Sequence, residues 1–455
     1  MADGKTSTLI SPELDTSLLC PAKVYGRCRG SSLLQLSTLC PLPSAICPRL
    51  PIACLFKPIS QGMRDVDEVI LSIDLGSSLT KAVWSDGCQT TQCHFLTMEP
   101  EVLQCGEDYL SAYRASRVNL YATSIEDVWL QLNKGGNVTA VGFLAQSLLA
   151  NVNLNALKYE SALYKILAVS GTIAESRRTT SLTVNLAVLL PWSEWSDRTQ
   201  LYEQVSKALK SFWFRGTHYR IKLKQWNTFP EGAGVTIHRC TGLSQATKTI
   251  VTLVFGHRNT SCLVFERGML VEGDTTDLGF YRLIDYIINQ TSGQNPHRLT
   301  QSIYQLGNSL NPENPLVKSL CKSQRLENQK REAIELIEAI TMAQKSYWAL
   351  ISQWLIAKVP NSINEIVVAG GTAKYLYSHL SQYFSGVSSY WGTDWQEKIE
   401  ALPQFKYVDL HQKDRESLAF RFVDVYANHQ LQLKSRQTQT SLGEGRGQMA
   451  EGRRN

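Results

Sequence analysis

Short apolar stretches alternate along most of the chain with longer segments in which apolar residues recur every three or four positions. The short stretches are typical of buried β-strands, and the longer spacing is typical of helices that bury one face. The predicted strands cover residues 70–75, 81–84, 183–190, 250–255, 261–266 and 365–369. The predicted helices cover residues 158–169, 197–212, 278–290, 329–357 and 416–433. This alternation indicates an α/β fold.

The longest predicted helix, 329–357, has a regular apolar face. Its members recur at three- and four-residue steps, so they share one side of the helix and are expected in the core. They are Tyr347, Leu350, Ile351, Trp354 and Leu355.

Two of the predicted strand pairs are joined by tight glycine turns. The first pair, "ILSIDLGSSLTKAVW" (70–84), carries Asp74 just before its turn. The second pair, "LVFGHRNTSCLVFERG" (253–268), has a turn of the same predicted shape but no carboxylate in it. The two hairpins therefore look alike except for the acid.

The first turn has the residues that a phosphate-binding loop needs. Backbone N–H groups of a turn between strands can converge on one phosphate, and Gly76 lets the backbone come close because it lacks a Cβ. Ser77 and Ser78 can add hydroxyl donors, and Lys81 can add a positive charge. Asp74 would hold Mg²⁺ through water, since this small cation keeps much of its hydration shell. An ordinary D-x-G hairpin turn is the alternative.

A second glycine pair follows a predicted strand in "EIVVAGGTAKYL" (365–376). At Gly370 and Gly371 a flat ligand can lie against bare backbone, and Thr372 can cap the helix that follows. The alternative is a simple tight connection between a strand and a helix.

The segment "FPEGAG" (229–234) displays a carboxylate on a turn. Pro230 and the two glycines keep Glu231 off a regular helix surface, and from such a turn its carboxylate can orient an attacking water. Taken alone, this residue is equally an exposed turn glutamate.

The order of these features resembles the actin-like ATPase superfamily, whose plan is shared with sugar kinases and heat-shock chaperones. Within that group the chain is most similar to the ParM/StbA plasmid-segregation actins, over about Glu68 to Asn428. Two further segments contribute to the resemblance, "LAVLLPWSEWSDR" (186–198) and "EGDTTDLGFYRLIDYI" (272–287). Each motif is loose by itself, and their joint order is the specific signal.

The resemblance implies a two-lobed α/β fold, in which two ribonuclease-H-like domains enclose a nucleotide cleft. Lobe I is expected over 67–247, with a variable outer subdomain at about 90–155. Lobe II is expected over 248–407. The helix 416–433 is expected to pack back onto lobe I.

The resemblance also implies roles for single residues. Asp74, Gly76, Ser77, Ser78 and Lys81 match the first phosphate loop. Glu231 matches the acid that orients the attacking water. Gly279 matches the glycine at which the start of a helix approaches the nucleotide. The adenosine loop is matched by Gly370, Gly371, Thr372 and Ala373. The implied ligand is ATP with Mg²⁺, and GTP is possible because two glycines accept either purine.

The second hairpin departs from the superfamily pattern. In that superfamily the second hairpin usually begins with Asp-x-Gly. When Gly256 is taken as this glycine, the position of the acid is occupied by Val254, whose side chain cannot bind a metal. Donors take its place around the turn, namely His257, Arg258, Asn259 and Thr260. We therefore expect that nucleotide binding persists while hydrolysis is slower than in relatives with both acids.

The expected function is that of a cytoplasmic, ParM-like protein that binds and slowly hydrolyses ATP. Its subunits would join head to tail into filaments that move plasmid DNA through a DNA-binding adaptor protein. Two alternatives remain, a small-molecule (sugar) kinase of the same fold and a scaffold that binds nucleotide without hydrolysing it.

The charge of the chain is concentrated at its ends. Residues 1–62 hold six Lys or Arg against three Asp or Glu, residues 434–455 hold five against two, and 35 of each sign lie between them. The neutral body gives no sign of the basic groove with which proteins bind DNA directly. No apolar run reaches the roughly 18 residues of a membrane span, so no membrane contact is expected.

Both ends are predicted to lie outside the fold. The first 62 residues hold seven of the fifteen prolines and show no periodicity, so residues 1–66 are treated as an extension. They are either a transit peptide or sequence upstream of a translation start at Met63, and the second is favoured. Residues 434–455 are rich in Gly, Gln and Arg and are predicted to be a disordered tail.

The eleven cysteines are scattered along the chain. None forms a CxxC pair, so a zinc site is not predicted. Buried, reduced thiols in a cytoplasm are the expectation.

Overall fold

The computed structural model describes residues 68–87, 89–116, 125–150, 154, 157–240, 247–406 and 410–451. The predicted extension 1–66 lies outside the described residues, and so does Cys88. The five described cysteines are free thiols, and they are Cys93, Cys105, Cys240, Cys262 and Cys321. No described helix is both long and apolar enough to cross a membrane.

The first sheet has nine strands and begins with the predicted hairpin. Its order is β3-β2-β1-β7-β9-β8-β5-β6-β4. The strands are β1 (Glu68–Leu75), β2 (Thr80–Asp86), β3 (Gln89–Met98), β4 (Val102–Cys105), β5 (Trp129–Gln131), β6 (Val138–Val141), β7 (Ser181–Leu190), β8 (Phe212–Phe214) and β9 (Thr217–Pro230). β1, β2 and β3 are antiparallel neighbours, and β1, β7 and β9 run parallel.

The second sheet repeats the arrangement of β3-β2-β1-β7-β9 in the first sheet. Its order is β12-β11-β10-β13-β14, with three antiparallel strands followed by two parallel ones. The strands are β10 (Thr249–Phe255), β11 (Thr260–Glu266), β12 (Met269–Thr276), β13 (Glu365–Ala369) and β14 (Ser388–Tyr390). The two hairpins thus occupy equivalent places in a duplicated α/β unit, which confirms the predicted fold class.

Each predicted strand lies within an observed one, because buried strands have a strong local signal. The five predicted helices correspond to the observed helices α3 (Lys158–Ser176), α4 (Arg198–Leu209), α6 (Phe280–Gln290), α9 (Leu326–Lys358) and α14 (Gln412–Glu451). The remaining helices are α1 (Glu107–Ser116), α2 (Phe143–Ser147), the 3₁₀ helix η2 (Trp192–Asp197), α5 (Ala233–Arg239), α7 (Pro296–Leu306), α8 (Pro315–Leu320), α10 (Gly371–Tyr375), α11 (Tyr377–Tyr383), α12 (Thr393–Ala401) and α13 (Pro403–Lys406).

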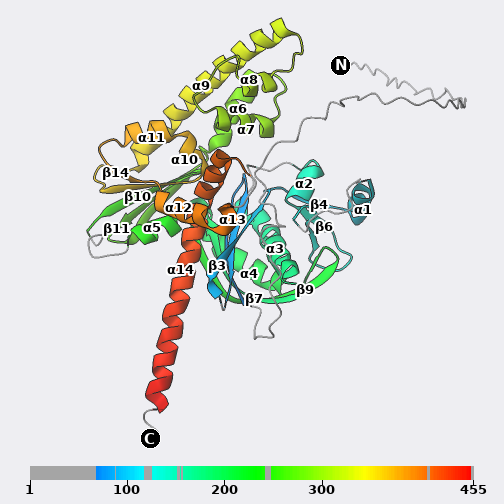
Figure 1. Ribbon diagram of the computed structural model, residues 1–455, viewed down its shortest axis with the longest axis vertical. Coiled ribbons are helices and arrows are strands. Elements are labelled where there is room, and N and C mark those ends of the chain that lie inside the picture. The colour runs from blue at the N-terminus through cyan, green and yellow to red at the C-terminus, as the bar shows by residue number, and fades with distance from the viewer. Residues whose placement is uncertain are drawn as a thin grey trace, which may run out of the picture. The chain divides into compact units, whose positions relative to one another are not determined.

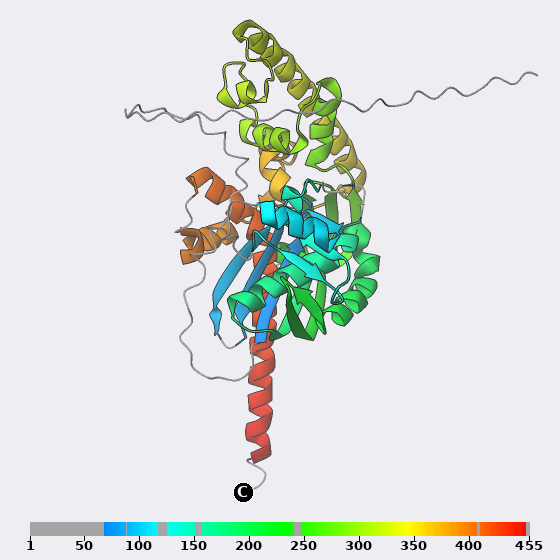
Figure 2. The same ribbon diagram turned by 90° about the vertical axis from the view of Figure 1, so that its right-hand side faces the viewer.

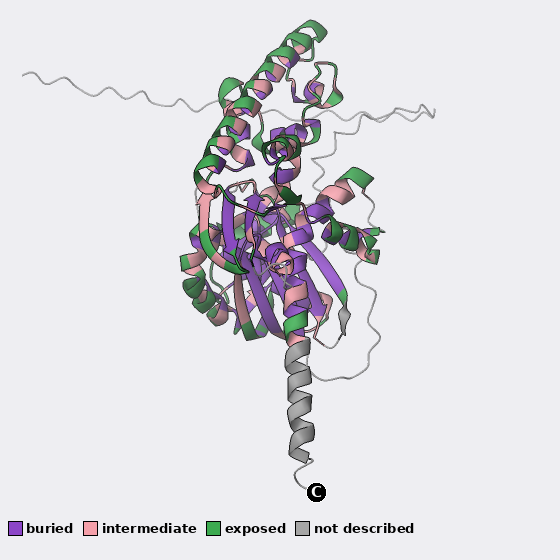
Figure 3. Ribbon diagram, turned by 90° about the vertical axis from the view of Figure 1, so that its left-hand side faces the viewer, coloured by how far each residue is buried: buried purple, intermediate pink, exposed green. Residues whose placement is uncertain are grey.

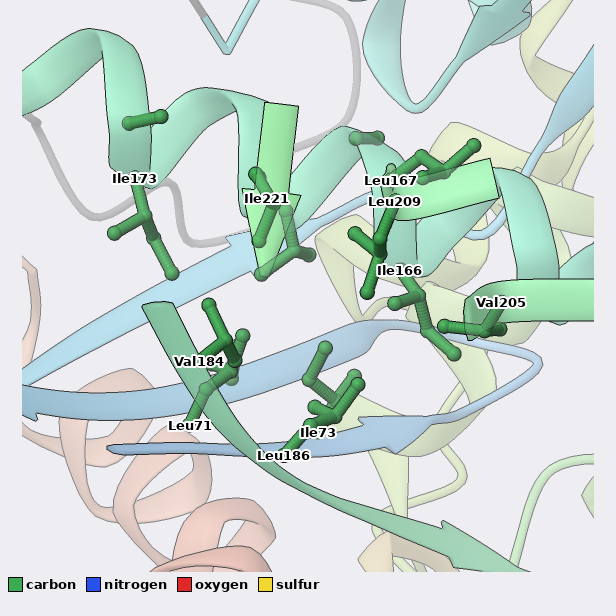
Figure 4. Close-up of a cluster of buried hydrophobic side chains, with 14 of the residues drawn as sticks. Leu71, Ile73, Ile166, Leu167, Ile173, Val184, Leu186, Val205, Leu209 and Ile221 are labelled. Carbon is green, nitrogen blue, oxygen red and sulfur yellow. The ribbon is translucent and has the colours of Figure 1, made fainter. Parts of the chain in front are cut away.

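Each sheet has its own apolar core. In the first, side chains of β1 and β7 pack against α3 and α4, as the sticks in Figure 4 show for Ile73, Leu186, Ile166 and Leu209. In the second, β10 and β13 pack with α6 and α9. Figure 3 shows the buried strands, and the exposed residues that α9 carries along its length.

Helix α14 adds a third core that draws on both sheets. Phe422 lies in this core with Val83 of the first sheet and Val367 of the second, and its ring meets Phe95 and Phe405 edge to face. Figures 1 and 2 both show α14 running alongside β1 to β3. The helix was expected to pack back onto lobe I, and it contacts β1, β2 and β7 of the first sheet as well as α12 and β13.

The structure adds detail to three other expectations. Helix α14 continues past residue 434 to Glu451, and residues 452–455 of the predicted tail lie outside the described residues. β3 pairs with β2 in the main sheet, so only the part from β4 onwards builds the separate small cluster around Leu144. Leu350 of α9 is 47% exposed. The face of this long helix that is buried is therefore narrower than the stripe of apolar residues in its sequence.

Candidate functional site

The first hairpin brings Asp74 and Lys81 together. The two residues are direct partners across β1 and β2, and Asp74 Oδ2 lies 2.5 Å from Lys81 Nζ. Burial would raise the pKa of Asp74, but Lys81, Lys158 and Arg421 outweigh it and hold the pKa below its usual value. The carboxylate is therefore ionised at neutral pH. Ser77, in the turn, is buried, whereas Ser78 is exposed.

The Glu231 turn packs against the second hairpin. A Cβ added at Gly232 would lie 2.6 Å from Cγ2 of Val254, so the turn is next to the position of the missing acid. The Glu231 carboxylate forms a short ion pair with Lys158 of α3, and both residues are more than nine-tenths buried. A water-orienting role for Glu231 therefore requires that it share its carboxylate with Lys158.

The second turn uses two of its predicted donors inside the protein. Arg258 forms an ion pair with the fully buried Glu194 of η2, which also accepts the N–H of Tyr159 at 3.0 Å. The Thr260 hydroxyl donates to the Leu278 carbonyl at 2.8 Å and is fully buried. These bonds hold both side chains within the protein and stabilise the hairpin. Sequence spacing did not reveal their partners, which lie 64 and 18 positions away in the chain.

Two donors of this turn remain. Asn259 is buried, and its Nδ2 finds no hydrogen-bond partner among the described residues. Burial, with smaller effects of Arg421 and His297, lowers the pKa of His257 to about 4, so its imidazole is neutral at pH 7. A neutral imidazole and a free amide can each donate one hydrogen bond to a phosphate oxygen.

The predicted adenosine loop rests directly on the second hairpin. Gly370 has φ of +89°, and a Cβ there would clash with the Phe255 carbonyl. Thr372 donates to the Gly256 carbonyl at 2.9 Å and does not cap its helix as expected. Ala373 is fully buried, and the hydroxyl of Tyr304 donates to the Gly371 carbonyl at 3.0 Å. The loop and the hairpin turn thus form one continuous backbone surface.

Gly279 allows a close approach, but to protein rather than to open space. A Cβ at this position would clash with the backbone of His257 and Arg258. The first N–H groups of α6, those of Phe280 and Tyr281, donate to the Gly256 and His257 carbonyls at 3.2 and 3.0 Å. The start of α6 is therefore bound to the hairpin turn.

Helix α14 supplies two side chains that the sequence did not single out. Arg421 donates to Ser78 Oγ at 3.0 Å, and its stem lies beside Gly371. Asp424 accepts the N–H of Gly232 at 2.6 Å and of Val235 at 3.3 Å. Their partners lie 343 and 192 positions away in the sequence, so no local pattern marks them.

The environment of Asp424 also changes its titration. Burial, together with the nearby Asp74 and Glu231, raises the pKa of Asp424 to about 7 against the effect of its two backbone donors. Asp424 is therefore partly protonated at neutral pH, while the more strongly paired Asp74 keeps its charge.

Two lysines of α3 were also missed. Lys158 pairs with Glu231, and Lys165 is only 3% exposed and has no hydrogen bond or ion pair to a described residue. Burial and the nearby Lys158 lower the pKa of Lys165 to about 8, although Glu101 and Asp74 act in the opposite direction. The sequence did contain a signal for Lys165, namely a lysine on the apolar side of a predicted helix. Such a lysine is unusual, because unpaired lysines are rarely buried.

The carboxylates present do not form a resident metal site. No group of three or more His, Cys, Asp or Glu that could hold a metal occurs among the described residues. Asp74, the predicted metal residue, already pairs with Lys81, and Val254 contributes no ligand. Since Mg²⁺ is often held mainly by water and substrate phosphates, this donor set suits an ion that arrives with the nucleotide.

Solved structures of actin-like proteins are similar to this chain. The actin-like protein Alp7A superposes with a TM-score of 0.52 at 11% identity, over 83% of this chain and all of Alp7A. The apo psk41 ParM protein gives 0.44 at 15% identity, over 78% and 97% of the two chains, and the Alp12 filament structure gives 0.44 at 13%, over 79% and 99%. No protein-family model and no curated protein matches the chain.

The Alp7A superposition agrees with the duplicated topology of the two sheets. The chain therefore has an actin-like fold. The predicted two-lobed, actin-like fold class is confirmed at this level. At 11% identity the superposition establishes the fold alone.

The ion pair between Arg258 and Glu194 generates a stability prediction. Arg258→Met leaves a fully buried carboxylate without its cation, so the free energy of unfolding should fall by about 3–5 kcal/mol. Adding Glu194→Gln to this variant should restore more than half of the loss in urea denaturation. As a matched control, Arg282→Met breaks the exposed pair with Asp277 and should cost at most about 1 kcal/mol. Equal losses for the two arginines would contradict this account.

The titration of His257 generates a pH prediction. Its pKa is near 4 in the folded chain and near 6.5 when unfolded, so only the unfolded state takes up this proton between those pH values. Unfolding free energy should therefore fall with decreasing pH by up to about 1.4 kcal/mol per pH unit from this residue. His257→Gln should reduce the slope measured between pH 6.5 and 4, and Asn308→Gln, an exposed substitution without a titratable group, should leave it unchanged. A slope that is unaffected by His257→Gln would show that the imidazole protonates in the folded chain.

Proposed function

We propose that this chain binds a purine nucleoside triphosphate, ATP or GTP, between its two hairpins. The observation that supports this most strongly is Arg421, which contacts Ser78 of the first hairpin and lies beside Gly371 of the adenosine loop. These are the two segments that a nucleotide would connect, one through its phosphates and the other through its base and ribose. A guanidinium between them is suited to bind phosphate oxygens.

Both turns would contribute backbone and side-chain donors to the phosphates. Gly76, Ser77, Ser78 and Lys81 belong to the first turn, and the second adds Gly256, His257 and the unpaired amide of Asn259. Gly370, Gly371, Thr372 and Ala373 would line the base. Asp74 is the carboxylate best placed to face Mg²⁺ that the nucleotide brings, through water.

Hydrolysis is proposed to be slow. Glu231 is the residue suited to orient water, but its carboxylate is bonded to Lys158, and Val254 leaves the second acid position apolar. The same two observations favour a scaffold that binds nucleotide and does not hydrolyse it. A sugar kinase is disfavoured, because its base must be free to accept a proton from the substrate hydroxyl.

The subunits are proposed to assemble head to tail with nucleotide bound. A contact between two different surfaces of the same chain does not close into a dimer, and it extends into a filament unless the rotation closes a ring. The actin-like fold supports this proposal. Filament growth in the cytoplasm would then move plasmid DNA through a DNA-binding adaptor protein.

Light scattering with electron microscopy tests this function. Adding ATP or GTP should raise scattering and produce filaments, and Arg421→Met should require more nucleotide for the same signal because it removes a phosphate donor. Lys413→Met, an exposed change on the same helix, should behave like the wild type. If the chain binds nucleotide and forms no filaments, the filament function is excluded, and a scaffold that binds nucleotide remains.

Restoring the acid at position 254 tests the account of slow hydrolysis. Val254→Asp should raise phosphate release at least about tenfold, which corresponds to about 1.4 kcal/mol of transition-state stabilisation. Val254→Asn has nearly the same shape without the charge and should give no increase. If both variants release phosphate at the wild-type rate, the missing acid does not limit hydrolysis.

A further inference from the structure

Helix α3 presents two buried lysines toward the region between the hairpins. Lys158 and Lys165 are seven residues apart, which is close to two helical turns, so they lie on one face about 10 Å apart along the axis. Ala162 lies between them on this face and is fully buried.

Lys165 has no compensating bond in the protein. It is 3% exposed, and no described residue accepts a hydrogen bond from its ammonium group. Burying an unpaired charge is costly, so such a side chain usually has a ligand or a functional partner. Lys165 shares its face of α3 with Lys158, whose Nζ is bonded to Glu231 in the turn that packs against Val254 of the second hairpin. The charges of Asp74 and Arg258 also act on Lys165, in agreement with a position near both hairpins.

The charges around these lysines leave an excess of positive charge. Three nearby acids are already paired with a cation, in the pairs Asp74–Lys81, Glu231–Lys158 and Glu194–Arg258. Asp424 accepts two backbone N–H groups, and burial raises its pKa to about 7, which weakens its charge. Glu101 is the other acid that acts on Lys165, and burial raises its pKa to about 7, which weakens its charge. Lys165 and Arg421 thus remain available for an anion.

Such an excess is what a metal ion provides in other triphosphate sites. Lysine, arginine and Mg²⁺ all stabilise phosphoryl groups by placing positive charge next to their oxygens. Here the second acid of the metal pattern is Val254, and the described residues hold no cluster of metal ligands. The chain has lost a carboxylate at the position where it would hold the ion and has two buried lysines in the same region.

We propose that Lys165, assisted by Lys158, supplies enough positive charge to neutralise the triphosphate by itself, so that ATP binding to this chain does not require Mg²⁺. This inference rests on the proposed function and specifies the charge requirement of the same site. The triphosphate oxygens accept hydrogen bonds from Lys165 Nζ, and Lys158 adds its charge while it remains bonded to Glu231. No covalent step is involved.

Calorimetric titration of ATP into the full chain, with Mg²⁺ and separately with EDTA, tests this inference. The dissociation constants under the two conditions should agree within about threefold, a difference below 1 kcal/mol. Binding that is more than about tenfold weaker in EDTA would overturn the inference and leave the proposed function intact. Absence of ATP and GTP binding under both conditions would overturn the proposed function and, with it, the inference.

A substitution of Lys165 identifies the group responsible. Lys165→Met should weaken ATP binding in EDTA by about 10- to 100-fold, since a hydrogen bond to a charged group is lost, and should weaken it less with Mg²⁺ present. The control Lys207→Met removes an exposed lysine of α4 and should bind ATP like the wild type in both conditions. Wild-type affinity of Lys165→Met in EDTA would overturn the role of Lys165.

Thermal unfolding without nucleotide separates a binding defect from misfolding. Lys165→Met replaces an unpaired buried charge with an apolar side chain of similar length, so its melting temperature at pH 7 should equal or exceed that of the wild type. Added ATP in EDTA should then raise the melting temperature of the wild type but not that of Lys165→Met. A rise of equal size in both would contradict the inference.

Discussion

The packing of α14 between the two sheets is the constraint on which the candidate site depends. Phe422 and its neighbours bury apolar side chains of both sheets in one core, and the same helix carries Arg421 and Asp424 on its more exposed side. Because Asp424 is bonded to the Glu231 turn and Arg421 to the first hairpin, these segments keep fixed positions relative to the helix. The hydrophobic effect thus positions charged groups that could not hold one another in place by themselves.

The duplication gives the two hairpins the same geometry and different chemistry. The first retains an ionised acid and a lysine facing each other across the strands. In the second, the acid position is Val254, and Arg258 is bonded to η2, so that this turn is stabilised by an ion pair with a distant segment.

Much of the fold could be predicted from the sequence, because strand and helix periodicity, turn glycines and motif order are local signals. The positions of the strands along the chain and the likeness of the two hairpins followed from them. The partners of Arg421, Asp424 and Arg258 could not be predicted, since each contact joins segments far apart in the chain. Local rules also failed where tertiary contacts replaced them, as for the hydroxyl of Thr372, which bonds to the second hairpin and not to its own helix.

The central claim is that the two hairpins grip one triphosphate, and an experimental structure with a non-hydrolysable ATP analogue tests it most directly. The account predicts phosphates between the turns at 76–79 and 256–259, with Lys165 Nζ within hydrogen-bond distance of a phosphate oxygen and the base against Gly370 and Gly371. An analogue bound elsewhere, or phosphates that contact neither turn, would contradict the account.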